Sequence, residues 1–496
     1  AIDHPSAWAR RDWVAIALVA LGAAAVRLVG LSTPSGFVFD EIFYARIACR
    51  FVIDTARCGI EDLVSGAHPP LGNWLIGIGI RLFGYNEFGW RVTSALAGIV
   101  TVAFLYLLVR RLLAGHVTAP AATAGATAAA ALLATDFLHL VQSRVAMLDS
   151  FVTLFVVAAV LFAVLDGRRR QGSRGEDLDA PGWLRRLALG RPWRLAAGLA
   201  LGSAIAVKWS GGYLAIGLVV LLVAWEVAAT ERPAEGKGSS WWSAFGTAFR
   251  REAVPSLVLL GAVPVVVYLA SYTGRVHGDL LALPWREGSA WRVILEHQLA
   301  MLRFHTGLAG DHPYESAPWA WLLLKRPVAY SFADGTGYRE VVAIGNPLTW
   351  WPGALALGYV GVRWVRSGAS LARPEVVVLA AALSTYLPWL ILSGSRSQVF
   401  IWYLLPTIPF LYAALGLVAA NAWRSLAGRI SLAMAAGAIA LSFVFFWPIL
   451  TASPLAPDAW RTRIWFADCD RPGAPTLTLP DDEINSGPPP SGWCWI

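Results

Sequence analysis

Two adjacent carboxylates, Asp40 and Glu41, follow the first membrane-length apolar segment of the chain. Charged residues at a membrane boundary are costly to keep there, so a functional role is the default hypothesis, with a helix-end anchor as the plainer alternative. A carboxylate in this place can act as a general base on a hydroxyl group. Neighbouring side chains diverge by about 100° on a helix and roughly 180° on a strand, so we expect the two acids to have unequal roles.

Several cations and one further acid recur at predicted helix ends on the same side. Buried charges are costly unless opposite charges lie nearby. The common depth of these cations therefore suggests one site for an anionic substrate. Alternatively, each side chain reaches the lipid headgroups or pairs with a nearby acid. The residues are Arg27, Arg91, Arg144, Asp149, Lys208 and Arg396.

His68 lies before a Pro-Pro pair that keeps the chain out of a helix until Leu71, so we expect it on an irregular turn. Phosphate contact and a structural role are equally plausible for this imidazole. The apolar run 75–80 is too short to span a membrane and is predicted to lie in the interface or to re-enter. A metal held by Asp40, Glu41 and His68 is the weaker hypothesis. If the anionic substrate is a lipid monophosphate, Arg and Lys side chains alone can balance its charge.

The elements that position these residues are membrane helices. The chain has 496 residues, of which 57% are apolar and 15% charged, so it is typical of a polytopic membrane protein. We predict an all-α fold with about eleven spanning helices. They lie near residues 12–31, 88–109, 118–138, 145–165, 194–208, 212–230, 253–273, 346–364, 375–393, 399–420 and 430–450.

Basic clusters set the expected orientation. They fall on one side if the helices alternate, and the positive-inside rule makes that side cytoplasmic. The N-terminus is then cytoplasmic and the C-terminus extracytoplasmic, with large outer loops at 32–87 and 274–345 and an outer tail at 451–496. Residues 1–450 form one transmembrane catalytic domain in this interpretation. The net charge of +8 lies in short inner loops that face anionic lipids, so no nucleic-acid site is expected.

All four cysteines, Cys49, Cys58, Cys469 and Cys494, fall on the predicted oxidising side. Two disulfides are expected, and local pairing is the simplest of three connectivities. Zinc binding is the weaker interpretation, because no pair has the two-residue spacing of a zinc knuckle. His297, His305 and His312 are spaced eight and seven residues apart, which fits no common ligand pattern and favours a structural or acceptor-surface role.

An ordered set of motifs resembles the protein O-mannosyltransferases, membrane enzymes of the C-type glycosyltransferase superfamily. No single motif is decisive, but the order extends over most of the chain. The matching segments are 39–44, 68–72, 143–150, 207–211, 312–314, 316–319 and 403–406.

The resemblance implies a specific reaction. Such enzymes transfer mannose from polyprenyl-phosphate-mannose to Ser or Thr hydroxyls of exported proteins, with inversion and at the outer face of the plasma membrane. Asp40 would be the base, and Glu41 would position the base or the acceptor. Ser/Thr-rich secreted proteins, membrane lipid and the secretion translocon are the implied partners, and no cofactor is required. The implied donor-binding residues are Arg27, His68, Arg91, Arg144, Asp149, Lys208 and Arg396.

Two departures from the family narrow this expectation. Asn73 stands where the family commonly has lysine, with Arg46 and Arg81 as candidate substitutes. The 274–345 loop is too short for the β-trefoil domain of fungal and animal members, so the chain resembles the compact actinobacterial type. Its first loop has interfacial helices in this topology. Acceptor recognition then falls to the loops and the tail, with His312, Tyr314 and Trp319 as candidates.

Two alternatives come from other classes. A transporter or lipid flippase would show internal repeats and broken helices at the bilayer midplane, and no convincing repeat is present. Another C-type transferase could place a sugar on lipid or polysaccharide. Composition does not distinguish these acceptors, and only the ordered motifs favour protein.

Overall fold

The computed structural model describes most of the chain between Trp8 and Ile464. The described residues are 8–53, 57–59, 67–172, 191–230, 246, 255–273, 275–276, 279–280, 290–307, 314–333, 336–392 and 398–464. Candidate residues Arg396, His312, Cys469 and Cys494 lie outside them.

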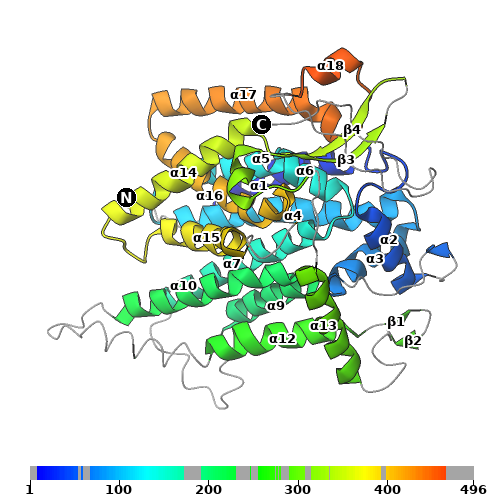
Figure 1. The fold of residues 1–496 in the computed structure, drawn as a ribbon. Coiled ribbons are helices and arrows are strands. Elements are labelled where there is room, and N and C mark those ends of the chain that lie inside the picture. The colour runs from blue at the N-terminus through cyan, green and yellow to red at the C-terminus, as the bar shows by residue number, and fades with distance from the viewer. Residues whose placement is uncertain are drawn as a thin grey trace.

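Long apolar helices run side by side and make up the body of the molecule (Figure 1). By length and composition, six described helices qualify as membrane spans, or seven if one bent pair counts as a single span. The fold is therefore that of a multi-pass, mostly helical membrane protein. The long helices are α1 (Arg10–Leu28), α4 (Glu87–Leu113), α5 (Ala119–Ala134), α7 (Leu148–Gly172), α9 (Pro192–Val207), α10 (Tyr213–Thr230), α14 (Pro347–Arg366), α15 (Pro374–Leu392), α16 (Ile408–Ala422) and α17 (Leu426–Leu450).

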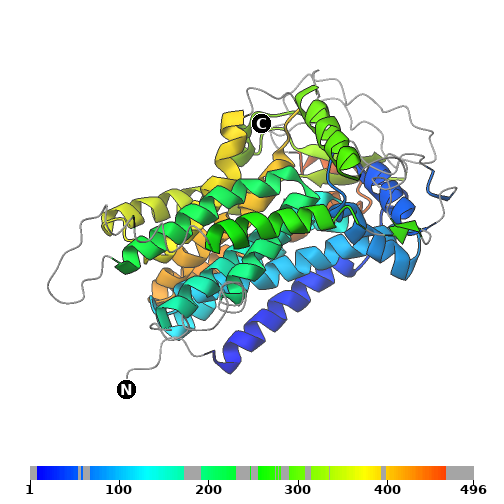
Figure 2. The ribbon, with the colours of Figure 1, turned by 90° about the horizontal axis from the view of Figure 1, so that it is seen from below.

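Shorter elements gather at one end of this bundle, which we call the site end (Figures 1 and 2). They include the helices α2 (Glu41–Val52), α3 (Leu71–Phe83), α13 (Ala290–Gly307) and α18 (Pro457–Arg461). Two antiparallel hairpins lie there as well, β1 (Arg275–Val276) with β2 (Asp279–Leu280) and β3 (Val328–Ala333) with β4 (Arg339–Ala343). The expectation of an all-α fold was therefore wrong in detail. Val328, Tyr330, Phe332 and the Val341-Val342 pair have the β-branched and aromatic character that favours strands.

One expected span is broken at its site end. The predicted span 118–138 stops at Ala134, and α6 (Phe137–Arg144) continues at an angle of 56°. The break follows from Asp136, whose Oδ1 accepts the backbone N–H of His139 at 2.7 Å and caps the new helix. Helix α9 ends before the extended residue Lys208, close to the predicted end of its span, and the 3₁₀ helix η3 (Trp209–Gly212) leads into α10. Polar residues of the expected site thus lie at helix breaks.

Further irregular turns are built into the bundle. The segment before α12 (Val263–Ala270) is a π-helical turn, η4 (Val258–Ala262). Two 3₁₀ helices, η6 (Pro318–Leu323) and η8 (Ile401–Thr407), lie in the second half of the chain. The expected span 399–420 therefore begins with a 3₁₀ turn and becomes α-helical only at Ile408.

The first loop, in which we expect interfacial helices, contains two short helices, α2 and α3. Helix α3 packs against both α2 and the start of α4. A close approach at Gly79 makes this possible, because a side chain there would collide with the Gly89 carbonyl oxygen. The first loop is thereby held firmly on the bundle.

Candidate active site

Asp40 is the N-cap of α2, and the residue before it has an unusual backbone conformation. Phe39 has a φ of 53°, in the left-handed region that residues with a side chain seldom adopt. Its ring stacks on Tyr330 of β3, with centroids 4.4 Å apart, and meets Trp402 of η8 edge-on at 5.3 Å. Such strain persists only where surrounding contacts enforce it. Rings from the second half of the chain thus set the backbone that carries Asp40.

Glu41 points into the protein and is fully buried. Its two oxygens accept the Nε–H and Nη2–H of Arg91, each at 2.8 Å, in a bidentate ion pair. They also accept backbone N–H groups, Oε1 from Ala146 at 2.8 Å and Oε2 from Val38 at 2.9 Å. Glu41 therefore joins the first loop to α4 and to the segment before α7.

Arg91 is committed to the same structural junction. Beyond Glu41, its guanidinium donates to the carbonyl oxygens of Leu31, Pro34 and Gly36, at 3.2, 2.7 and 2.9 Å. The side chain is completely buried. Five N–H groups in a planar fork suit this role, because they can satisfy a carboxylate and several carbonyls together.

Asp40 has different surroundings from its neighbour. Its carboxylate accepts a hydrogen bond from Tyr44, one turn along α2. It also interacts electrostatically with Lys208 and Asp149. Lys208 Nζ and Asp149 Oδ2 form an ion pair at 2.6 Å. We call Asp40, Tyr44, Asp149 and Lys208 the acidic cluster. It combines residues from α2, the first turn of α7 and the break after α9.

The acidic cluster changes the basicity of Asp40. Burial raises the pKa of this carboxyl from 3.8 to about 6, with Asp149 adding to the rise and Lys208 and Tyr44 opposing it. A carboxylate with a pKa near the working pH is well suited to accept a proton from a hydroxyl group.

Aromatic and imidazole rings continue from the acidic cluster to α13. The ring of His68 lies 6.1 Å from Tyr44 and 5.7 Å from His305, and His305 lies 6.1 Å from Trp209, the residue after Lys208. His305 Nε2 is 2.7 Å from the carbonyl oxygen of Ala67. His305 thus belongs to the neighbourhood of the site, although its sequence spacing favoured a structural or acceptor-surface role. Its position on an amphipathic helix was the available signal.

Arg27 and Arg144 make structural contacts on the other side of the first loop. Arg27 is fully buried and donates to the Ala134 carbonyl at 3.0 Å, and its Nη2 lies 2.8 Å from His139 Nδ1. Arg144 donates to the carbonyls of Val26, Arg27, Val29 and Gly30 at the end of α1. These contacts satisfy carbonyl groups that a helix end leaves without partners.

The acceptor-side candidates that are described lie in the second half of the chain. Trp319 of η6 is 61% exposed, and Lys325 Nζ lies 5.7 Å from its ring centroid. Tyr314 is partly buried, and burial together with the nearby Glu340 of β4 raises the pKa of its hydroxyl.

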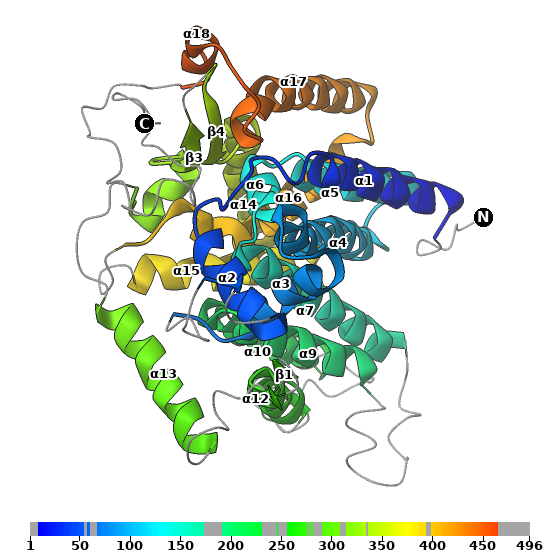
Figure 3. The same cartoon turned by 90° about the vertical axis from the view of Figure 1, so that its right-hand side faces the viewer.

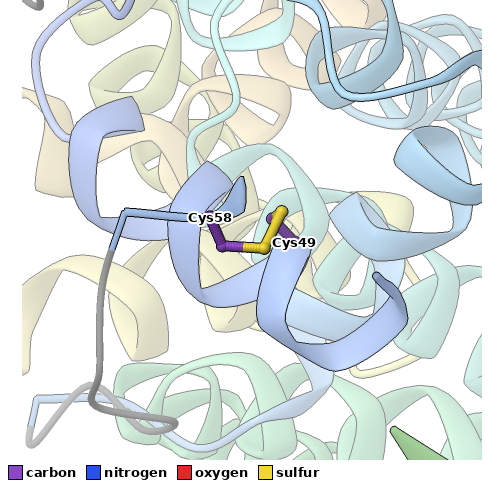
Figure 4. The surroundings of a disulfide bond; sticks show 2 residues. All are labelled: Cys49 and Cys58. Atoms are coloured by element: carbon purple, nitrogen blue, oxygen red, sulfur yellow. A yellow bond between two sulfur atoms is a disulfide. The ribbon is translucent and has the colours of Figure 1, made fainter. Parts of the chain in front are cut away.

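One expected disulfide is present within the described residues. Cys49 of α2 is bonded to Cys58, and the two Cα atoms are 5.6 Å apart (Figure 4). This confirms local pairing for the first pair. Among the described residues, no group of three His, Cys, Asp or Glu side chains has a metal-binding arrangement.

Comparisons with solved structures place this architecture in a class. The yeast protein O-mannosyltransferase Pmt1-Pmt2 complex bound to its sugar donor matches with a TM-score of 0.69 and 15% identity, over 93% of each chain. ArnT from Cupriavidus metallidurans, bound to undecaprenyl phosphate, matches with a TM-score of 0.52 and 19% identity, over 87% of this chain and 64% of that one. The helical bundle therefore belongs to the same fold class as these two membrane proteins.

Sequence comparisons identify the family within this class. Residues 67–173 match the family model of dolichyl-phosphate-mannose-protein mannosyltransferase, and residues 290–469 match that of the C-terminal four-transmembrane region of protein O-mannosyltransferase. The polyprenol-phosphate-mannose–protein mannosyltransferase of Mycobacterium tuberculosis is 32% identical, over 92% of this chain and 91% of that protein. The chain belongs to the protein O-mannosyltransferase family. This confirms the resemblance on which the sequence analysis relied.

Proposed function

We propose that this protein transfers mannose from polyprenyl-phosphate-mannose to Ser or Thr hydroxyls of proteins, with Asp40 as the general base. The observation that carries the proposal is the position of Asp40 beside the Lys208–Asp149 ion pair, in a chain of this family. The relatives' names supply the donor and the acceptor class, and the acidic cluster supplies a base and a cation.

The proposed reaction is a single displacement. The acceptor oxygen forms a bond to the anomeric carbon while the bond from that carbon to the phosphate oxygen breaks. The hydroxyl proton passes to Asp40, and the bonding electron pair leaves with the phosphate. A single displacement inverts the anomeric carbon and needs one carboxylate, which agrees with the different surroundings of Asp40 and Glu41.

Lys208 is the cation we assign to the donor phosphate, and His68 and His305, whose rings lie near Tyr44 and Trp209, are further candidates. Charge stabilisation of a leaving phosphate can come from Lys or Arg side chains as well as from a metal. We assign Arg27, Arg91 and Arg144 to the scaffold, because their described contacts are with carbonyl groups, His139 and Glu41. In this proposal no metal is required. Turnover should survive EDTA, and a loss restored by Mn²⁺ would overturn this point.

The cellular setting follows from the same proposal. The site end faces the extracytoplasmic side of the plasma membrane, with the N-terminus in the cytoplasm and the C-terminus outside. Residues 1–450 act as one catalytic domain. Ser/Thr-rich exported proteins emerging from the secretion translocon are the proposed acceptors. Tyr314 and Trp319 are proposed to contact them, with His312 as a further candidate from the sequence.

A transfer assay with purified protein tests the donor and the acceptor together. Radiolabelled polyprenyl-phosphate-mannose is incubated with a Ser/Thr-rich peptide and membranes, and the destination of the label is measured. Label on the peptide supports the proposal. Label on lipid or polysaccharide instead would favour another C-type transferase, and label that only crosses the membrane would favour a transporter.

Asp40→Asn tests the assigned base in the same assay. We expect transfer to fall by about 10²–10⁴-fold, because base assistance typically contributes that much. Binding of the labelled donor should be retained. The matched control is Asp458→Asn, at an exposed position of α18, which should leave turnover unchanged. Normal turnover by Asp40→Asn would remove Asp40 as the base.

A further inference from the structure

Helix α13 has three distinct faces. One faces the protein, a second is apolar and exposed, and a third is charged and exposed. The bundle therefore covers only one face of this amphipathic helix and leaves its apolar face exposed. The inward face carries Ile294, His297, Gln298, Met301 and His305. The apolar face carries Trp291, Leu295, Leu299 and Leu302, with exposures of 68, 58, 41 and 49%. The charged face carries Arg292, Glu296 and Arg303.

Hydrogen bonds fix the height of α13 along the bundle. The hydroxyl of Tyr268, near the end of α12, donates to Gln298 Oε1 at 2.5 Å, and that of Tyr272 lies 2.8 Å from His297 Nδ1. Gln298 Nε2 also donates to the Tyr272 hydroxyl at 2.8 Å. Tyr side chains at the ends of membrane helices are typical of the level where the hydrocarbon core meets the headgroups. The middle of α13 lies at that level.

The direction of α13 differs from that of the bundle. It runs across the end of α12 in Figure 1, and in Figure 3 it is seen lengthwise at the periphery while α12 is seen end-on. A helix at this height, crossing the bundle at its edge, has the direction expected of a helix that lies in the plane of a membrane surface.

We propose that the apolar face of α13 is embedded in the membrane surface at the site end, as an interfacial anchor. Interfacial helices have an apolar face with Trp and Leu beside a charged face, as α13 does. Its neighbour α12 also exposes apolar side chains, Val265 by 56% and Val266 by 64%. An acceptor polypeptide on this face is the competing occupant.

The anchor has a consequence for the active site. The inward face of the same helix brings His305 to Ala67 and beside His68, at the edge of the acidic cluster. Lipid that holds α13 in place would therefore hold this histidine pair in place. The inference goes beyond the proposed function, since it concerns only where α13 lies.

Nitroxide accessibility in nanodiscs tests the proposal without an activity readout. Spin labels are placed at Leu302→Cys on the apolar face and at Arg303→Cys on the charged face, in the full chain with Cys469 and Cys494 replaced by Ser. The discs contain phosphatidylglycerol and phosphatidylethanolamine. Leu295→Cys repeats the measurement on the apolar face in case one labelled variant fails to fold.

Lipid contact should make the label at Leu302 several-fold more accessible to oxygen than to a water-soluble nickel chelate, with the reverse at Arg303. Equal nickel accessibility at both positions would overturn the proposal. Protection of Leu302 that appears only when a Ser/Thr-rich acceptor protein is added would also overturn it, and would assign the face to acceptor docking.

Discussion

At the scale of single residues, two adjacent carboxylates have opposite surroundings. Glu41 is enclosed by Arg91 and two backbone N–H groups, whereas Asp40 accepts a hydrogen bond from Tyr44 and lies beside the Lys208–Asp149 pair. Burial raises the pKa of Asp40 to about 6. A base must be deprotonated to act, so the proposed reaction should be lost as the pH falls through this pKa.

The pH profile of kcat/KM should report this carboxyl. We expect kcat/KM to fall about tenfold per pH unit on the acid side, with a midpoint near the Asp40 pKa of about 6. Asp149→Asn should move the midpoint to lower pH, because the Asp149 carboxylate raises the Asp40 pKa, and Lys208→Met should move it to higher pH. A midpoint that stays in place in both variants would contradict the assignment.

At the scale of elements, helix ends and breaks bring the polar residues together. Asp40 begins α2, Asp149 lies in the first turn of α7, and Lys208 lies in the gap between α9 and η3. The Glu41–Arg91 pair then ties α2 to α4. A buried ion pair of this kind stabilises little when compared with apolar packing, but removing one partner leaves an uncompensated charge.

Glu41→Gln should therefore destabilise the fold by about 3–5 kcal/mol, because it leaves the buried guanidinium of Arg91 without its counter-charge. Thermal unfolding in detergent would measure the loss. The matched control is Glu296→Gln, which breaks the exposed Arg292–Glu296 pair and should change the unfolding temperature little. Equal unfolding temperatures for the two variants would show that the buried pair is not the junction we infer.

At the scale of the whole molecule, the site joins distant parts of the chain. Phe39 and Asp40 come from the first loop, Asp149 and Lys208 from the middle, and Tyr330, Trp402 and His305 from the region of the C-terminal family model. All these parts meet at the site end. The side of the membrane that this end faces therefore decides where the proposed transfer reaction occurs.

Cysteine labelling in intact cells tests the proposed sidedness. Arg303→Cys places a thiol on the charged face of α13 at the site end, and Ser370→Cys places one between α14 and α15 at the opposite end; both positions are exposed. In a background with Cys469 and Cys494 replaced by Ser, a membrane-impermeant maleimide should label only Arg303→Cys. Labelling of Ser370→Cys alone would show that the protein has the opposite orientation in the membrane to the one we propose.

The sequence by itself determined the class of the fold and the family. Membrane-length apolar runs predict spanning helices because backbone groups in lipid must bond within their own segment. The ordered motifs, including the one around Asp40 and Glu41, led to the family. Local pairing of Cys49 with Cys58 was the simplest of the possible disulfide connectivities. These features depend on composition, on neighbours in the chain or on motif order.

Only the tertiary structure decided which cations lie near Asp40 and which complete the scaffold. Arg27, Arg91 and Lys208 look alike in sequence, since each is a cation at a helix end, and the partners that distinguish them are fifty or more residues away. The bend after Asp136, the hairpin that stacks Tyr330 on Phe39 and the placement of His305 likewise follow from long-range packing. Local propensity carries no information about such contacts, because their free energy exists only once the helices have assembled.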